Sequence, residues 1–165
     1  MTKLPDNWKI VKLGDVSEII MGQSPPSNTY NCENNGLPFY QGKTEFRTRY
    51  PKGKICCSSP KKTAKKQDIL MSVRAPVGSV NIANMDCCIG RGLCAIRCGD
   101  KLDFMYVYHF LKTNEKIISS MGVGSTFTAI NKKTIEELKI PIPSIPIQRR
   151  IISILEKAEQ TKQMR

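Results

Sequence analysis

The fold is decided by the stretch "DILMSVRAPVGSVNIANMDCCIGRGLCAIRC", residues 68–98. It holds three short runs of strand-forming residues, "DILMSV", "GSVNIA" and "CCIGRGLCAIRC", separated by the turn signals "RAPVG" and "NMD". This spacing predicts a meander of antiparallel strands. Gly90 and Gly92 flank Arg91 in the last run, which indicates a bulge or a close approach of another backbone segment.

Beyond this stretch the hydrophobic period changes from that of a strand to that of a helix. Apolar residues recur three and four positions apart between 104 and 121. Asp103 is placed to cap the start of this helix, and Gly122 is placed to cap its end. His109, the only histidine, lies off the apolar stripe. We therefore expect a surface or rim histidine without a catalytic role.

The segments around these two blocks complete a mixed pattern. Residues 8–20 alternate loosely and then turn helical, residues 21–36 predict a loop, and residues 37–46 predict a short strand. A short helix is expected near 132–138, and prolines force the segment 139–147 to be extended. The expected fold is α+β, a twisted and mainly antiparallel sheet with short helices, followed by a protruding C-terminal coiled-coil helix.

The last helix is expected to start near Pro146 and to carry a narrow apolar stripe. The spacing of four, three and four residues is typical of a coiled-coil seam rather than of a broad core face. No second helix of matching length is predicted in the sequence, so the stripe predicts a partner helix. Packing of this helix on its own domain remains the alternative. The stripe consists of Ile147, Ile151, Ile154 and Ala158.

The charge of the chain favours a polyanionic partner. The formal net charge is +12 over 165 residues. Residues 41–66 contain nine lysines and arginines against the single acid Glu45, with aromatic residues between them. Such a density of positive charge favours a phosphate backbone through counterion release, and a solvated surface or a membrane surface is the weaker interpretation. Arginines can read guanine edges in a major groove, and Gln41 can read adenine.

Cysteine usage and the N-terminus indicate a cytoplasmic protein. The seven cysteines are odd in number, and the opening "MTKLPDNWKI" has no apolar signal core. No run of about 18 apolar residues predicts a membrane span. A structural zinc site is disfavoured, because no C-x-x-C pair occurs. We expect the cysteines to be small core and strand residues.

Catalytic patterns are largely missing from the sequence. It contains neither a G-x-x-x-x-G-K-[ST] loop nor a G-x-G-x-x-G fingerprint. Asp6, Glu137 and Lys139 could be forced into a nuclease pattern, but these pieces are too common and too far apart to carry weight. The residue types favour a protein that reads a polyanion over an enzyme.

Several segments together resemble the specificity subunit of type I restriction-modification systems. The opening "LPDNWKIVKLGDVSEIIMGQSPPSNTYN" and the strand "GLPFYQGKTEF" match the family, as do "DILMSVRAPVGSVNIAN" and "CCIGRGLCAI". The closing "GSTFTAINKKTIEELKIPIPSIPIQRRIISILEKAE" matches it as well. The resemblance covers the whole length, and it is the order and spacing of the pieces that make it specific.

The resemblance implies a chain without a catalytic site of its own. Residues 1–143 would form one DNA target recognition domain, and residues 144–165 the start of a spacer and dimerisation helix. The implied partners are double-stranded DNA, methyltransferase subunits, the restriction subunit through the complex, and a second specificity half paired through an antiparallel helix. S-adenosylmethionine, magnesium and ATP would belong to the partner subunits, and no cofactor or metal is expected in this chain.

The expected DNA contacts come mainly from the basic segment. Ser125 and Thr126 sit in a glycine turn that suits a phosphate, although a turn that caps the next segment is the equal alternative. The complete set of candidates is Lys43, Arg47, Arg49, Lys61, Lys62, Lys65, Lys66, Arg74, Arg91, Ser125 and Thr126.

The sequence also departs from the family pattern. The family usually has Glu-Gln-Gln-Arg-Ile at the start of the spacer helix, whereas residues 147–151 read Ile-Gln-Arg-Arg-Ile, which leaves the partner contacts open. A half-subunit that dimerises and a fragment of a longer subunit are both compatible with one recognition domain. Two other functions stay open: a recognition module of a fused restriction enzyme or methyltransferase, and a competitor for the methyltransferase subunit that does not read DNA.

Overall fold

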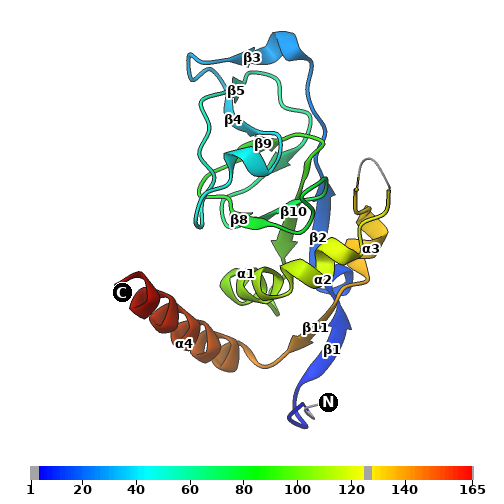
Figure 1. The fold of residues 1–165 in the computed structure, drawn as a ribbon, viewed down its shortest axis with the longest axis vertical. Helices are drawn as coiled ribbons and strands as arrows, with labels where there is room; N and C mark the ends of the chain where they lie inside the picture. The colour runs from blue at the N-terminus through cyan, green and yellow to red at the C-terminus, as the bar shows by residue number, and fades with distance from the viewer. Residues whose placement is uncertain (1–3, 125–127, 165) are drawn as a thin grey trace.

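The computed structural model describes residues 4–124 and 128–164. Figure 1 shows an upper part built from strands and a lower part built from helices and a two-stranded ribbon. The α+β architecture expected from the sequence is confirmed. Three short 3-10 helices connect the strands: η1 (Leu13–Asp15), η2 (Ser27–Thr29) and η3 (Lys43–Glu45).

The central layer is a four-stranded sheet in which every neighbouring pair is antiparallel. Both faces of this sheet are covered, because alternate residues of one strand belong to different core clusters. Cys94 and Ile96 pack toward the helices, whereas Leu93 and Ala95 pack toward the second sheet. In spatial order the strands are β2 (Ser17–Met21), β10 (Leu93–Cys98), β7 (Ile69–Ser72) and β8 (Val80–Ile82).

The second sheet corrects the expectation of a simple antiparallel meander. Strand β9 follows β8 in the chain but pairs in this second sheet, where it runs parallel to β4 and antiparallel to β6. The turn at residues 90–92 then returns the chain to the first sheet as β10. In spatial order the strands are β3 (Tyr30–Asn31), β5 (Cys56–Cys57), β4 (Leu37–Tyr40), β9 (Cys87–Ile89) and β6 (Thr63–Ala64).

Strand β2 is a second correction, because the sequence predicted a helical turn in this region. Ile19 and Ile20 lie opposite Ile96 and Ala95 of β10 in antiparallel register. Their β-branched side chains suit a strand, and the pairing with β10 decides the local conformation.

Three helices cover the lower face of the four-stranded sheet. The side chain of Asp103 accepts a hydrogen bond from the Met105 amide at 3.0 Å, which confirms the predicted N-cap. The predicted single helix is interrupted at Asn114, and the segment before Gly122 forms a separate short helix. The buried Tyr108 comes from the first of these helices. The helices are α1 (Phe104–Thr113), α2 (Glu115–Ser120) and α3 (Lys132–Glu136).

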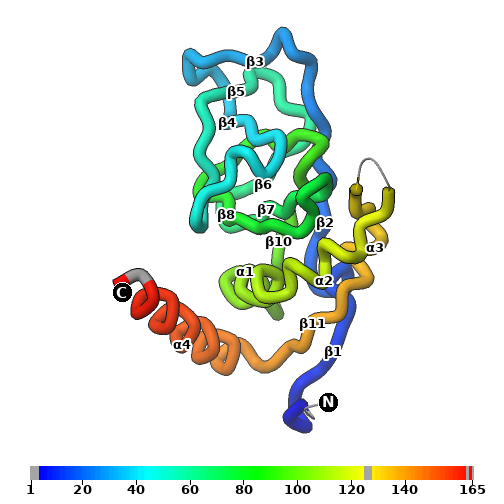
Figure 2. The backbone as a smooth tube through the Cα atoms, viewed as in Figure 1, coloured from blue at the N-terminus to red at the C-terminus, as the bar shows by residue number. Residues whose placement is uncertain are grey.

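A two-stranded ribbon, built from both ends of the chain, leads into the C-terminal helix, as Figure 2 shows. Strands β1 (Lys9–Lys12) and β11 (Lys139–Ile142) form a two-stranded antiparallel sheet. Helix α4 (Ile145–Gln163) follows directly and lies beside α1. In residues 4–124 and 128–164, no helix combines the length and apolar character that a bilayer span requires.

Most cysteines lie in the core, as predicted. Cys87 and Cys88 belong to different core clusters, because neighbouring residues of a strand point to opposite faces. All seven thiols are free. Burial raises the pKa of Cys87 and of Cys88 to about 12, so both thiols remain protonated at neutral pH.

Candidate nucleic-acid interface

The ends of three strands in the second sheet meet at one edge. Because β4 and β9 are parallel, Gln41 and Gly90 follow them at the same end, and the Gly90 amide donates to the Tyr40 carbonyl at 2.8 Å. Strand β6 is antiparallel to β9, so the residues before β6 reach this edge as well. The Ile89 amide donates to the Lys62 carbonyl at 3.0 Å.

The first sheet adds a further basic residue to this edge. The Val73 amide donates to the Gly92 carbonyl at 2.9 Å, which places Arg74 next to the turn that carries Arg91. We call this set of exposed residues the strand-end surface. It consists of Gln41, Lys61, Lys62, Arg74 and Arg91.

Three glycines let these backbone segments come together. A Cβ atom on Gly92 would lie 2.2 Å from the Gln41 carbonyl oxygen, and one on Gly22 would lie 2.0 Å from the Gly90 oxygen. A Cβ atom on Gly90 would lie 3.2 Å from the Gln41 Cα. Side chains at Gly22 and Gly92 would therefore push the strand ends apart. The close backbone approach predicted for Gly90 and Gly92 is confirmed.

The cations of the strand-end surface are not neutralised by neighbouring acids. In the part of the chain that the structure describes, Lys61, Lys62, Arg74 and Arg91 form no ion pair. The nearby carboxylate of Glu45 is occupied by the amides of residues 41 and 42, at 3.2 and 3.1 Å. Exposed and uncompensated cations are suited to a phosphate backbone.

Two polar residues at this edge were not among the sequence predictions. The Gln23 amide donates to the Ile89 carbonyl at 3.0 Å, and the Ser24 hydroxyl oxygen accepts from the Arg91 amide at 3.2 Å. Both follow Gly22 in a segment that the sequence describes only as a loop. The available signal was Gly22 itself, but the strand before it was not predicted and its contact partner Gly90 lies far away in the chain.

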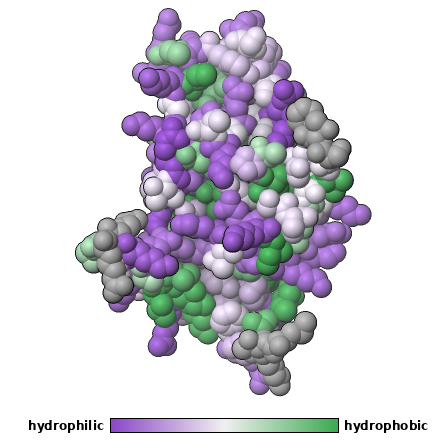
Figure 3. Space-filling view, in the orientation of Figure 1, coloured by the Kyte–Doolittle hydropathy of each residue, from purple (hydrophilic) through white to green (hydrophobic). Residues whose placement is uncertain are grey.

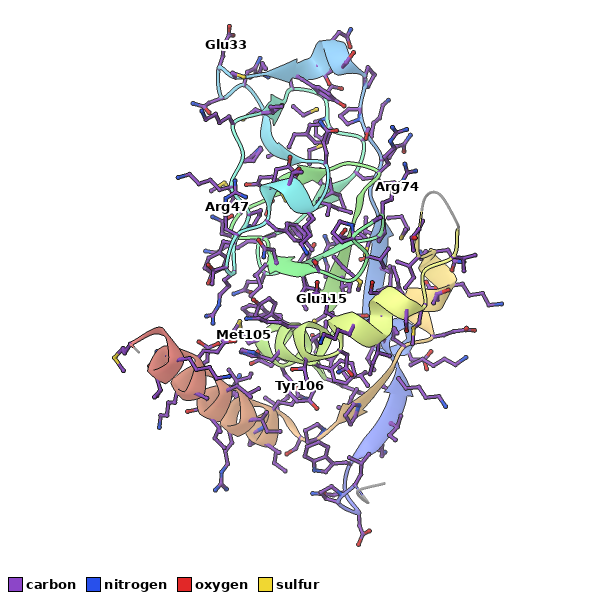
Figure 4. The ribbon with its side chains drawn as sticks, viewed as in Figure 1. Glu33, Arg47, Arg74, Met105, Tyr106 and Glu115 are labelled. Atoms are coloured by element: carbon purple, nitrogen blue, oxygen red, sulfur yellow. The ribbon has the colours of Figure 1, made fainter. Side chains whose placement is uncertain are left out.

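The remaining basic candidates lie elsewhere. The Arg47 guanidinium donates to the carbonyls of Thr44 and Phe46, and Figure 4 shows Arg47 and Arg74 at opposite edges of the molecule. Lys43 lies 3.8 Å from Glu115 of α2.

Lys65 and Lys66 lie at the other end of β6, in a turn rich in acids. Their amides donate to the carboxylates of Asp68 and Asp86, at 2.8 and 2.9 Å. The structure therefore does not bring these two lysines to the strand-end surface. Ser125 and Thr126 lie outside the described residues.

Arg49 has its own acidic partners on helix α4. Its guanidinium donates to both carboxylate oxygens of Glu156, at 2.9 and 3.1 Å, and to Glu159 at 3.1 Å. His109 lies 2.9 Å from Glu156, and Lys112 lies 2.9 Å from Glu159. His109 is 5% exposed, so the expected surface or rim position was wrong. The reason is that α4 covers this side of α1.

Burial and ion pairing act against each other in this cluster. Burial alone would raise the pKa of Glu156, but hydrogen bonds from Arg49 and His109 outweigh it and lower the pKa. The pKa of Glu159 is lowered in the same way by Lys112, again against the effect of burial. Both carboxylates are therefore charged at neutral pH.

The side chains of His109, Glu156 and Glu159 also have the mutual spacing of metal ligands, with ligand atoms within 4.8 Å of one another. However, Arg49 and Lys112 already bond to the two carboxylates. Two fixed cations beside these oxygens oppose a metal ion. We therefore interpret the cluster as an ion-pair network.

The C-terminal half of the predicted stripe of helix α4 lies outside the contact with its own domain. Ile154 is 60% exposed, and Ala158 is exposed as well. Ile147 is half-buried, and Ile151 packs partly against the core. Figure 3 shows hydrophobic surface along this helix. Helix α4 does pack on its own domain, as the alternative interpretation expected, but mainly through a different face, which carries Glu156 and Glu159.

Comparison with known proteins connects this architecture to one family. Residues 5–164 match the family model described as the type I restriction modification DNA specificity domain. The chain is 45% identical over 152 residues to a putative type I restriction enzyme MjaX specificity subunit of Methanocaldococcus jannaschii. That match covers 90% of this chain and 36% of the relative.

Solved structures agree with this result. The HsdS subunit from Thermoanaerobacter tengcongensis superimposes with a TM-score of 0.89 at 48% identity, covering 97% of this chain and 39% of that one. A chain from a structure concerning complex assembly and conformational transition of the type I R-M system has a TM-score of 0.91 at 49% identity. It covers 97% of this chain and 40% of that one. The chain thus spans less than half the length of these relatives, and it belongs to the family of type I restriction-modification DNA specificity domains.

Proposed function

We propose that this chain binds double-stranded DNA sequence-specifically and directs a separate methyltransferase, and through it a restriction subunit, to the bound site. The strand-end surface carries the proposal. It presents four exposed cations without acidic partners in the described part of the chain, and glycine-packed strand ends hold the backbone that carries them. Membership of the specificity family supports the same function.

The surface has groups for both parts of DNA recognition. Lys61, Lys62 and Arg91 suit phosphate contacts, which position a protein on the duplex without reading its sequence. Arginine and glutamine can read guanine and adenine edges in the major groove, and Arg74 and Gln41 supply these groups. Methyl transfer and cleavage are assigned to partner subunits, which would use S-adenosylmethionine, magnesium and ATP.

Two lysine pairs of identical composition provide a matched test. Lys61→Ala with Lys62→Ala removes two charges from the strand-end surface, whereas Lys65→Ala with Lys66→Ala removes two charges from the acid-rich turn. Binding to a mixed-sequence duplex would be measured by fluorescence anisotropy at several salt concentrations. Each lost phosphate contact flattens the plot of log K against log salt by about 0.9. We expect flattening by about 1 to 2 units for the first pair and little change for the second.

Each other outcome has a definite meaning. Equal effects of the two pairs would contradict the assignment of the surface, because the charge change would then matter more than its position. If the wild-type chain fails to bind duplex DNA at low salt, the proposed function is wrong, and a competitor for the methyltransferase subunit becomes the better interpretation. If the wild-type chain does bind duplex DNA, selection of bound duplexes from a random pool tests sequence specificity.

A further inference from the structure

Five side chains from three separate segments meet between the domain and helix α4. Arg49 comes from the basic segment, His109 and Lys112 come from α1, and Glu156 and Glu159 come from α4. Every ion pair in this group joins α4 to the rest of the domain. We call this group the polar joint.

We propose that the polar joint fixes the direction in which α4 leaves the domain, and that Arg49 is a positioning residue for this helix rather than a DNA contact. The sequence alone made Arg49 a candidate DNA contact. A DNA-contacting role and a helix-positioning role lead to different experimental predictions. The role of the joint in directing a partner rests on the proposed function, whereas its effect on the helix direction does not.

The first step is that α4 has two polar anchors. Near its start, the buried Gln148 accepts from the Asp103 amide at 2.8 Å and donates to the carbonyls of Lys101 and Pro143, at 2.9 and 3.0 Å. Glu156 forms the second anchor eight residues later, which is about 12 Å along a helix. A single contact would allow α4 to rotate about it, whereas two separate contacts fix the direction of the helix axis.

The second step is that the far side of the joint is itself fixed to the sheet. The Ile82 amide donates to the Arg49 carbonyl at 2.8 Å, which holds this residue along the edge strand β8. The Tyr108 hydroxyl donates to the Thr48 carbonyl at 3.3 Å. Asn81 bonds to both backbone groups of Arg47, at 3.0 and 2.9 Å. These bonds therefore fix the direction of α4 relative to the four-stranded sheet.

The third step concerns the chemistry of the guanidinium. Arg49 bridges two carboxylates at once, and its planar fork of donors suits this geometry better than the point charge of a lysine. Its charge is balanced by these acids, so it offers little to a phosphate. The guanidinium of Arg47, two residues earlier, donates only to backbone carbonyls in the described residues and forms no ion pair with an acid of α4.

The consequence concerns the proposed assembly. If the stripe on α4 packs against a second helix, any change in the direction of α4 also moves the protein to which the second helix belongs. The polar joint would thus set the placement of this recognition domain relative to its partners, without touching the DNA.

The direct test is a distance measurement by pulsed electron paramagnetic resonance. Spin labels would be attached at Ser119→Cys on α2 and Lys162→Cys on α4, which are both exposed, in a Cys32→Ser background. The labelled chain would be diluted with unlabelled chain, so that only distances within one chain are recorded. We expect a narrow distribution for the wild-type joint and a broadened or shifted one for Arg49→Ala.

Matched variants keep the test falsifiable. Arg47→Ala removes the same charge from the same segment and should leave the distribution unchanged. Glu156→Gln attacks the joint from the helix side and should broaden the distribution as Arg49→Ala does, while Arg49→Lys should restore part of the order. If Arg49→Ala and Arg47→Ala give the same distribution as the wild-type chain, the joint does not position α4 and the proposal is overturned.

DNA binding separates the two roles of Arg49. With the anisotropy assay described above, Arg49→Ala should leave the salt dependence unchanged. A flattening by about 0.9 units would identify Arg49 as a phosphate contact and would contradict the positioning role. A chain that binds no DNA but still loses helix order in Arg49→Ala would refute the proposed function and retain the joint.

Discussion

The glycines at the strand-end surface are required by the space around them and not by the backbone dihedral angles. Neither Gly22 nor Gly92 has the positive φ that favours glycine elsewhere in the chain, as at Gly36 and Gly78. Instead, a backbone carbonyl oxygen lies only 2.0 Å from the position of a Cβ on Gly22 and 2.2 Å from that on Gly92. A Cβ at such a position must displace backbone, and the displaced residues here carry the candidate DNA contacts.

Two glycines of this region therefore respond differently to the same substitution. Gly92→Ala places a Cβ atom 2.2 Å from the Gln41 carbonyl oxygen, whereas a Cβ atom on Gly42 meets nothing within 4 Å. We expect Gly92→Ala to lower the free energy of unfolding by about 1–3 kcal/mol through overpacking. Gly42→Ala should change it by less than about 0.5 kcal/mol. Urea denaturation of both variants checks this, and equal stabilities would contradict the close approach.

The residue scale also shows what one sequence can reveal. Gly90, Arg91 and Gly92 form a local pattern, and the close approach there could be predicted from it. The burial of His109 could not be predicted, because its partner Glu156 on the covering helix lies 47 residues further along the chain. The acidic partners of Arg49 are farther still, so its place in a basic segment was the only available signal.

At the scale of elements, the sequence predicted helices and strands correctly where residues within or next to the element determine where it begins and ends. The Asp103 cap, the short helix α3 and the extended residues of β11 follow from side-chain caps and prolines. The end of the segment 139–147 was predicted wrongly as extended, because a proline is accepted in the first turn of a helix and α4 already begins at Ile145. Strand β2 was missed because its conformation depends on pairing with β10, about 75 residues away in the chain. The switch of β9 to the second sheet likewise depends on its neighbours β4 and β6.

The contact between α1 and α4 should depend on pH in a defined direction. Burial opposes ionisation of Glu156, but the bonds from Arg49 and His109 win and keep its pKa below the ordinary value of 4.5. Its stabilising contribution is therefore complete above that pH and is lost as the pH falls through the folded-state value. Lys112 is the other charged group that pairs with Glu159 across this contact, and Tyr108 lies beside Lys112 rather than beside the carboxylates.

Arg49→Ala provides the measurement of this effect. We expect it to lower the free energy of unfolding by about 1 kcal/mol at about pH 5, and by clearly less at about pH 3. Carbon-13 carboxyl titration by nuclear magnetic resonance should show the pKa of Glu156 rising in this variant and unchanged in Arg47→Ala. A pKa of Glu156 that is the same in wild type and Arg49→Ala would show that the ion pair does not form in solution.

At the scale of the whole molecule, the family could be identified because the matching pieces extend over the complete length of the chain. The net charge of +12 predicted a polyanionic partner, but it could not show which lysines and arginines lie on the same surface. That division comes from the way the sheets pair, which gathers Lys61, Lys62, Arg74 and Arg91 at one edge and leaves Lys65 and Lys66 at the other end of β6. The predicted domain limits, 1–143 and 144–165, remain predictions.

The exposed stripe of α4 yields the last prediction, on assembly. Ile154 is 60% exposed, so Ile154→Asp should change the stability of the domain by less than about 0.5 kcal/mol. Ile151→Asp would be ambiguous, because Ile151 also packs against the core. If the stripe pairs with a second helix, Ile154→Asp should convert a dimer or partner complex to monomer in analytical ultracentrifugation. Ser153→Asp, which introduces the same charge at an exposed position away from the stripe, is the control.

The same variant connects pairing to function. In cells that express the chain with a methyltransferase subunit of this family and lack other adenine methylation, mapping of modified bases should show a bipartite motif. A symmetric motif would mean that two copies of this chain pair through α4, whereas an asymmetric motif would mean that a different recognition chain completes the reader. Ile154→Asp should abolish methylation while duplex binding by the domain persists, because the stripe and the strand-end surface are separate. Full methylation by Ile154→Asp would show that α4 does not organise the complex through this stripe.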